Sequence, residues 1–278
     1  YFSRDLGQCV STLRVSPNGK FAALLNESTH EHKFEIYAVD DLVDGKPPIY
    51  TSWATHLCWN IDNTLLIGHG FISSSWSESH GKSEMIKYDD RMNVSGQRPV
   101  VCSSFRSDTG LCVQAFTETD HSDSRESMMC KCAYRRKLVF RSVDVNGQVT
   151  KHPDGALEHS AFNSHEVKPA RCITVSPDNS MFCIVSGRDM NYAVELRSCE
   201  PPFNKISNIT RFHSTASWSH HGLVLGCIFG AVYKYDFETN KEIFLFESNG
   251  GFIDSICWVG DTIITLDGRG LIKGWKST

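Results

Sequence analysis

The sequence predicts an all-β protein built from repeated units of short strands. In the last unit three apolar runs, Ile253–Trp258, Thr262–Leu266 and Leu271–Trp275, are separated by short segments that contain Gly and Asp. Runs of about five residues rich in Ile, Thr and Trp favour strands, and Gly and Asp between them favour tight turns. The second observation is that the order of strand, polar turn and apolar strand recurs along the whole chain.

The interval between repeats indicates the number of units. The first strands end at positions 15, 59, 105, 175, 218 and 258, so successive units lie 44, 46, 70, 43 and 40 residues apart. Four of these intervals match a four-stranded propeller blade of about 40 to 45 residues, and the interval of 70 exceeds it by about 25. We therefore predict a single β-propeller of six blades with one insertion. Seven blades is the alternative, if a degenerate blade lies between Phe105 and Arg171, where an Asn-Gly hairpin at 139–149 has no fixed place.

The third strands carry a family resemblance. Met85–Asp89 and Val232–Asp236 end in Tyr-Asp, where WD-repeat propellers have Trp-Asp, and Lys273–Lys276 keeps the Trp. The chain therefore resembles a divergent WD-repeat propeller, although the Gly-His dipeptide expected before each first strand is missing. The resemblance implies units of roughly 9–53, 54–98, 99–169, 170–210, 211–251 and 252–278 with 1–8. The N-terminal strand, within residues 1–7, is expected to close the ring by pairing beside Trp275.

Composition narrows the classes of function. A net charge of -4 and a pI near 6.3 give no overall basic field, so nucleic acid is an unfavoured partner. No apolar run is long enough for a membrane span. The eleven cysteines include no Cys-x-x-Cys pair, and several lie in apolar runs. We interpret them as buried free thiols of an intracellular protein, cytoplasmic or nuclear, rather than as a disulfide framework. Because the chain lacks a starting Met, we also interpret it as a piece of a longer protein.

The long connections predict a binding face. In a propeller, the turns between first and second strands and between third and fourth strands lie on one rim, here called the first rim. The other connections lie on the second rim, which receives the long segments Asn26–Lys33, Gly70–Lys82, Thr117–Glu126 and Asp154–Pro169. Insertions gathered on one face of a repeat protein often bind partners. The predicted partner-binding residues are Phe71, Trp76, His80, Arg188 and Arg269. The alternatives are that Phe71 and Trp76 pack on their own blade, and that the arginines pair with neighbouring aspartates.

Motifs for catalysis or cofactor binding are missing from the sequence. It has no Gly-x-Ser-x-Gly, no phosphate-binding Gly-rich loop and no His-Glu-x-x-His. His30 with His32, and His220 with His221, supply pairs where zinc needs three or four ligands, so we predict neither a metal nor a cofactor. The sequence thus predicts a non-enzymatic scaffold that binds a protein or peptide partner within a multi-subunit complex. The alternatives are an enzyme or small-ligand-binding propeller with its site at the channel mouth, and the propeller domain of a larger enzyme.

Overall fold

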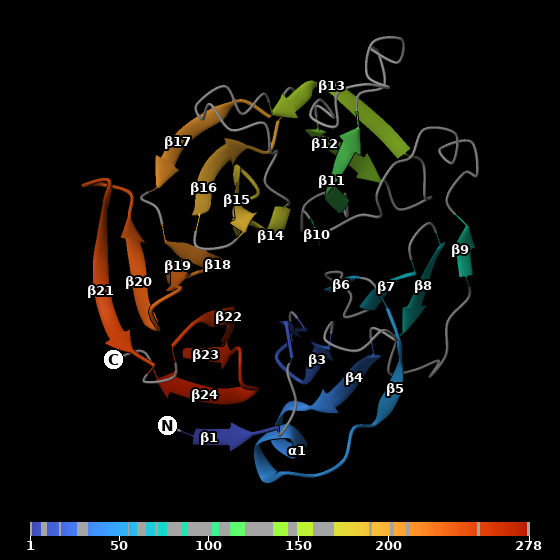
Figure 1. Cartoon of the computed structure of the whole chain (residues 1–278), viewed down its shortest axis with the longest axis vertical. Helices are drawn as coiled ribbons and strands as arrows, with labels where there is room; N and C mark the ends of the chain where they lie inside the picture. The colour runs from blue at the N-terminus through green and yellow to red at the C-terminus, as the bar shows by residue number, and fades with distance from the viewer. Residues whose placement is uncertain are drawn as a thin grey trace, which may run out of the picture.

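The described residues of the computed structural model form six four-stranded antiparallel sheets, which stand around a common axis (Figure 1). The structure describes residues 2–6, 10–16, 18–26, 33–54, 56–59, 65–69, 72–76, 85–87, 102–105, 112–119, 136–143, 149–157, 170–188, 191–200, 203–209, 212–248 and 251–276. Four of the sheets are described to the level of their side chains. The sheets β6–β9 and β10–β13 are described chiefly by their backbone.

The strands follow one another from the centre of the ring outward in five of the sheets. The first three sheets contain β2 (Thr12–Val15), β3 (Phe21–Leu25), β4 (Lys33–Ala38) and β5 (Tyr50–Trp53); β6 (His56–Trp59), β7 (Leu65–His69), β8 (Ile72–Trp76) and β9 (Met85–Lys87); and β10 (Cys102–Phe105), β11 (Cys112–Thr119), β12 (Arg136–Val143) and β13 (Val149–Leu157).

The other three sheets include one that joins the two ends of the described chain. They contain β14 (Ala170–Val175), β15 (Met181–Arg188), β16 (Asn191–Ser198) and β17 (Lys205–Ile209); β18 (His213–Ser219), β19 (Gly222–Cys227), β20 (Ala231–Asp236) and β21 (Lys241–Glu247); and β22 (Ile253–Val259), β23 (Thr262–Asp267) and β24 (Leu271–Lys276) with β1 (Phe2–Asp5). β1 pairs with β24 in an antiparallel register from Phe2 opposite Gly274 to Asp5 opposite Leu271.

The core lies between neighbouring sheets. Every residue of β3 is buried, because a second strand has a sheet neighbour on each side and an adjoining sheet on each face. One cluster joins Leu13 and Leu24 of the first sheet to Ile264, Leu266 and Ile272 of the last. The four sheets whose side chains are described therefore bury apolar surface against neighbouring sheets, as repeat architectures require.

Two of the first-rim turns are built in the same way. In the turn between β2 and β3, the Asn18 side-chain oxygen accepts the backbone N–H of Lys20 at 3.0 Å. In the turn between β14 and β15, a carboxylate oxygen of Asp178 accepts the N–H of Ser180 at 3.1 Å. In both turns a side-chain oxygen accepts the backbone N–H of the residue two positions later, which would otherwise lack a hydrogen-bond acceptor in the turn. This local chemistry explains why Asn18 and Asp178 favour turns at these two places.

The last sheet contains a chain of side-chain hydrogen bonds that involves Trp275, Thr265 and Ser248. The indole Nε1 of Trp275 donates to Oγ1 of Thr265 at 3.4 Å, and Thr265 Oγ1 lies 3.4 Å from Oγ of Ser248. Lys273 donates through its ammonium group to the carbonyl of Ser248. Ser248 thus supplies the hydroxyl that links the segment before β22 to the second and third strands of that sheet.

The structure corrects the sequence interpretation of the second and third sheets. The segment Gly70–Lys82 was expected to be a loop, but β8 occupies Ile72–Trp76 within it. Met85–Lys87 is consequently β9, the fourth strand, and not the third. Ser-rich β8 lacks the apolar pattern of a strand, and pairing with β7 overrides that weak propensity. In the third sheet the Asn-Gly hairpin joins the third and fourth strands, β12 and β13.

Two of the other segments expected to be long loops are also partly strand. β11 extends to Thr119 inside the segment that begins at Thr117, and β13 extends to Leu157 inside the segment that begins at Asp154. Their remaining residues, 120–126 and 158–169, lie outside the described residues, as do 27–32 of the segment Asn26–Lys33.

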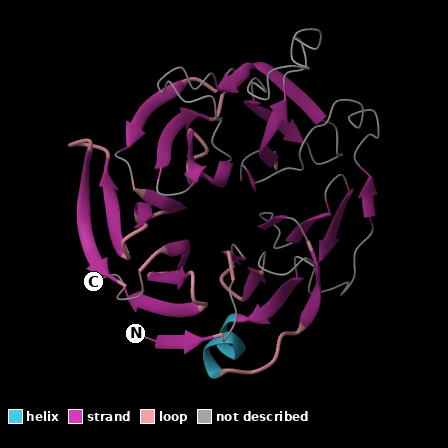
Figure 2. Ribbon diagram, in the orientation of Figure 1, coloured by secondary structure: helices cyan, strands magenta, loops and turns pink. Residues whose placement is uncertain are grey.

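A short helix, α1 (Val39–Asp44), separates β4 from β5 and was not predicted (Figure 2). Gly45 ends it with a φ of 81°, a left-handed conformation that favours glycine. The Arg4 side chain of β1 donates to the carbonyls of Leu42 and Asp41 in this helix. Its guanidinium also lies 5.5 Å from the ring centroid of Tyr37. β1 therefore contacts the first sheet as well as the last.

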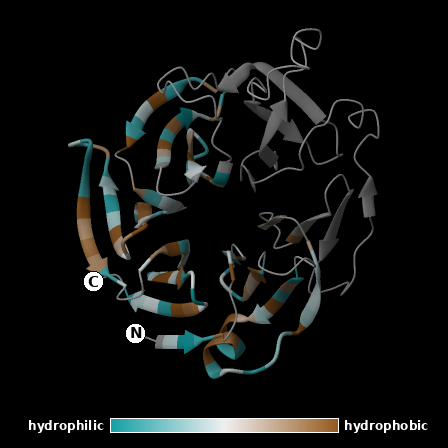
Figure 3. Ribbon diagram, in the orientation of Figure 1, coloured by the Kyte–Doolittle hydropathy of each residue, from teal (hydrophilic) through white to brown (hydrophobic). Residues whose placement is uncertain are grey.

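The outer strands β5, β17 and β21 are partly exposed and carry both hydrophilic and hydrophobic residues (Figure 3). In β21 the exposed residues Ile243, Phe244 and Leu245 form an apolar run bounded by Lys241 and Glu247. Charges at the ends of an edge strand discourage pairing with another chain. Within the described part of the chain, no helix is both long and apolar enough to cross a membrane.

Candidate functional site

A cavity of about 550 Å³ lies at the centre of the ring where the first strands end. Its walls come from the first strands β2, β6, β14, β18 and β22, and from Pro177, His220 and Gly260 in three of the turns that follow such strands. These turns belong to the first rim. The described cavity therefore lies on the rim opposite to the one that the sequence predicted as the binding face.

Three tryptophans from corresponding positions line this cavity. Trp59 is the last residue of β6, and Trp218 and Trp258 are the next-to-last residues of β18 and β22. Each first strand delivers its final residues to the same rim, so one position in the repeat places three indoles around one opening. The sequence carries this signal, since Trp recurs at 59, 218 and 258, but the length of the second-rim segments was given more weight.

The three indoles are held differently. Trp59 is buried and donates from Nε1 to the carbonyl of Arg14 at 3.1 Å. Trp218 stacks on Phe237 with ring centroids 5.2 Å apart, and Trp258 lies 5.1 Å from the ring of His221. The Nε1 atoms of Trp218 and Trp258 are buried and have no hydrogen-bond acceptor among the described residues. An unpaired buried donor is costly, and it marks these two side chains as places where a bound group or a small rearrangement would gain a hydrogen bond.

Arg14 brings a positive charge to the cavity wall. It lies in β2, and its guanidinium reaches Sγ of Cys172 in β14 at 3.8 Å and Oγ of Ser255 in β22 at 3.5 Å. It thus contacts two other sheets from within the ring. Burial raises the pKa of the Cys257 thiol, another cavity residue, to about 12, although Arg14 lowers it. Cys257 is therefore a neutral thiol at physiological pH and a poor nucleophile.

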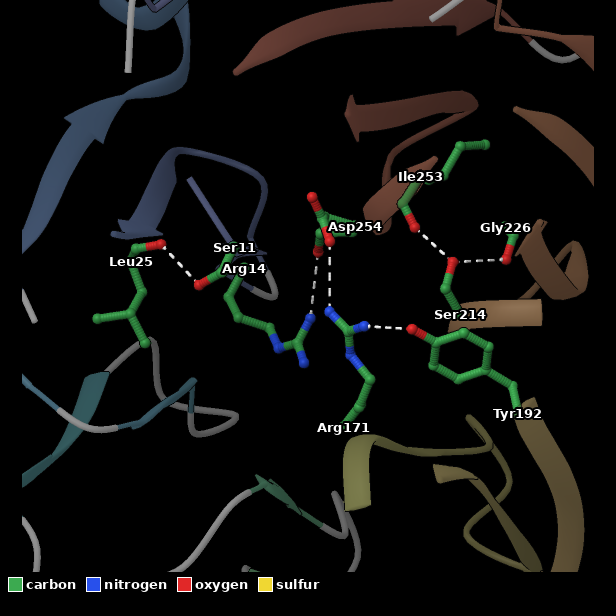
Figure 4. Close-up of polar contacts among 10 residues, drawn as sticks. Ser11, Arg14, Leu25, Arg171, Tyr192, Ser214, Gly226, Ile253 and Asp254 are labelled. Atoms are coloured by element: carbon green, nitrogen blue, oxygen red, sulfur yellow. Dashed lines mark hydrogen bonds and ion pairs between the residues drawn. The ribbon is translucent and has the colours of Figure 1, made fainter. Parts of the chain in front are cut away.

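A second polar cluster surrounds Arg171 at the start of β14. Its guanidinium lies 3.3 Å from a carboxylate oxygen of Asp254 and donates to the hydroxyl of Tyr192 at 2.7 Å (Figure 4). The same group lies 5.4 Å from the ring centroid of Phe252. Because these residues stand at the beginnings of first and third strands, the cluster faces the second rim. Tyr192 belongs to the same sheet as Arg171, whereas Asp254 belongs to the last sheet. The ion pair with Asp254 therefore joins two sheets that are separated in the sequence by the sheet β18–β21.

A third cluster lies on the first rim beside the cavity. His220 and His221 form the turn between β18 and β19, and Asp261 lies in the turn between β22 and β23. Nε2 of His221 is 2.8 Å from Oδ1 of Asp261. Sequence reasoning found the two histidines but missed Asp261, because the carboxylate is 40 residues away and reaches them only through the neighbouring sheet.

The predicted partner-binding residues fall mostly outside what the structure describes. Phe71 and His80 are not among the described residues. Trp76 and Arg188 were expected in loops, but they are the last residues of β8 and β15, and their side chains are not described. Arg269 lies exposed in the turn between β23 and β24, where its backbone N–H donates to Asp267 at 2.9 Å. The predicted grouping of these five residues stays a prediction.

Comparison with solved structures identifies the fold. The crystal structure of the β-propeller domain of Cps50 (Swd1) from Myceliophteria thermophila matches with a TM-score of 0.58 at 10% sequence identity. The match covers 100% of both chains. No protein-family model and no curated protein matches the sequence. The chain is therefore similar to a β-propeller domain over its full length, at an identity that speaks for the fold alone.

Proposed function

We propose that this chain is a non-enzymatic β-propeller scaffold that binds a protein or peptide partner in the cavity on its first rim. The observation that carries the proposal is the convergence of Trp59, Trp218 and Trp258 on one cavity. Tryptophan is enriched among the residues that dominate binding energy at interfaces, especially in central pockets. A volume of about 550 Å³ is within the usual range for a pocket that holds a ligand or part of one.

The chemistry of the cavity wall suits binding better than catalysis. Its described lining is chiefly aromatic, aliphatic and hydroxyl-bearing, with the guanidinium of Arg14 and the imidazole of His220. The Cys257 thiol in the cavity wall is neutral at physiological pH, because burial raises its pKa to about 12. A small-ligand-binding propeller with its site at the channel mouth is the second candidate, favoured by the same cavity volume. The first candidate requires that a protein or peptide occupies the cavity, whereas the second requires that a small molecule does.

The architecture that we propose to present this cavity is a six-bladed ring. Each of the six sheets lies within one of the units predicted from the repeat, from 9–53 to 252–278 with 1–8. The antiparallel pairing of β1 with β24, and the contact of Arg4 with α1, support closure of the ring by the N-terminal strand.

We further propose an intracellular location, cytoplasmic or nuclear, within a multi-subunit complex. The support is that, among the described residues, Cys172, Cys183, Cys227 and Cys257 are buried and form no disulfide. Buried free thiols fit a reducing compartment, where disulfides are rare.

The test is to isolate the partner and then measure its affinity for matched variants. Truncation of a central aromatic anchor costs about 2 kcal/mol or more, which is roughly thirtyfold in Kd. We expect Trp218→Ala to weaken binding by at least that factor. Trp53→Ala is the control, since Trp53 lies on the outer strand β5 and is 56% exposed.

The outcome also separates the two rims and the two candidate functions. Loss of binding in Arg188→Ala, at the end of the second strand β15, with Trp218→Ala unchanged, would move the site to the second rim and contradict the proposal. A small molecule that binds the cavity, when no peptide or protein does, would favour the second candidate. Circular dichroism of each variant shows whether its fold is kept.

A further inference from the structure

The turn residues beside the cavity bring three metal-ligating side chains together. The ligand atoms of His220, His221 and Asp261 all lie within 4.8 Å of one another. The two imidazole rings have centroids 3.9 Å apart, and the His221–Asp261 contact is 2.8 Å. Two adjacent sheets of the ring contribute to this group, so the fold and not the local sequence creates it.

The backbone under these side chains is well defined. β18 and β19 pair up to Ser219 opposite Gly222, and β22 and β23 pair up to Val259 opposite Thr262. Each turn therefore contains only two residues, and such hairpin turns restrict the backbone more than long loops do. In the first of them, the backbone N–H of His221 donates to Oγ of Ser219 at 3.0 Å.

The side chains keep enough freedom to close around an ion. His220 and Asp261 are exposed, and His221 is 31% exposed while its ring rests 5.1 Å from Trp258. A tetrahedral ion with bonds of about 2.0–2.1 Å holds its ligand atoms roughly 3.4 Å apart. Shifts of about 1 Å in exposed side chains bring the three atoms to that spacing, which rotamer adjustment supplies.

The donor set selects the kind of ion. Two imidazole nitrogens and one carboxylate oxygen suit zinc and its neighbours in the transition series, whereas Mg²⁺ and Ca²⁺ prefer oxygen ligands throughout. Three protein ligands on an exposed rim leave a fourth position for water. We propose that His220, His221 and Asp261 bind one zinc-class ion at the first rim, a site that shares His220 with the cavity wall but requires no partner to form.

Calorimetric titration of the metal-free chain with Zn²⁺ tests this site, with Co²⁺ absorption as a report of tetrahedral coordination. We expect one equivalent per chain and a rise in melting temperature, because an ion that binds only the folded state stabilises it. Mutation of a residue that only hydrogen-bonds to a metal ligand typically lowers metal affinity by about tenfold or more, so loss of a ligand itself should cost at least that much. His220→Ala, His221→Ala and Asp261→Asn should each show that loss while melting as the wild type does without metal.

Asp178→Asn is the matched control. It changes the same residue type in a first-rim turn, and Asn18 occupies the equivalent place in the turn between β2 and β3. This variant should bind zinc as the wild type does. The proposal is overturned if the wild-type chain binds no zinc. It is also overturned if all three ligand variants bind zinc as tightly as the wild type, since other thiols or histidines would then hold the ion.

Discussion

Deletion of residues 1–6 should lower the stability of the ring by about 5 kcal/mol. β1 forms four residue pairs with β24, and the backbone N–H of Leu6 donates to Gly270 at 3.1 Å. Roughly five hydrogen bonds are lost, each contributing about 1 kcal/mol net. The loss is a large share of the about 5–15 kcal/mol that stabilises a typical protein. It also exposes the edge of β24 and favours aggregation.

Thermal and urea unfolding measure this effect. For a chain of this size, about 5 kcal/mol corresponds to a fall in melting temperature of roughly 10 °C. Arg4→Met removes only the contacts with Leu42, Asp41 and Tyr37, so it should cost less than the deletion. Arg269→Met, at an exposed turn residue, should change nothing. An unchanged melting temperature and no aggregation after the deletion would refute closure by the N-terminal strand.

Three further predictions concern packing and protonation. Gly226→Ala should destabilise the fold by about 1–3 kcal/mol in urea unfolding, because the added Cβ would lie 2.7 Å from Cγ2 of Thr215. Stability should fall as pH rises from about 9 to 12, since the Cys257 pKa is raised to about 12 by burial and its thiol ionises first in the unfolded chain. Cys257→Ala should make this decline shallower without removing it, because burial also raises the pKa of Cys183. Burial lowers the pKa of His213, and this effect outweighs the opposite effect of the Glu242 carboxylate 3.1 Å away. Stability should therefore also fall as pH drops below about 6.5, where the unfolded chain binds a proton that the folded chain does not. His213→Asn should remove that dependence.

The sequence predicted strands best where local chemistry and tertiary packing agree. The apolar runs of β22, β23 and β24 have Gly or Asp at their turns, and all were located from sequence. β8 was missed because three of its five residues are serine. α1 was missed because six residues without a side-chain cap give little helical signal.

The candidate site was less accessible to sequence reasoning than the fold. The position of Trp59, Trp218 and Trp258 in the repeat was visible, but their convergence depends on the ring bringing distant first strands together. Asp261 illustrates the same limit, since only the packing of neighbouring sheets places it beside His221. Loop length pointed to the other rim, and a length alone carries no information about which side chains enclose a cavity.

The most direct test of partner binding on the first rim is a hydrogen–deuterium exchange footprint of the chain with and without its partner. The proposal predicts slower exchange in the turns at 219–222 and 259–262 and at the ends of the strands that carry Trp218 and Trp258. Backbone amides in these turns exchange readily unless a bound molecule covers them. Slower exchange confined to the second rim, around the end of β15 at Arg188 and the turn after β23, would contradict it.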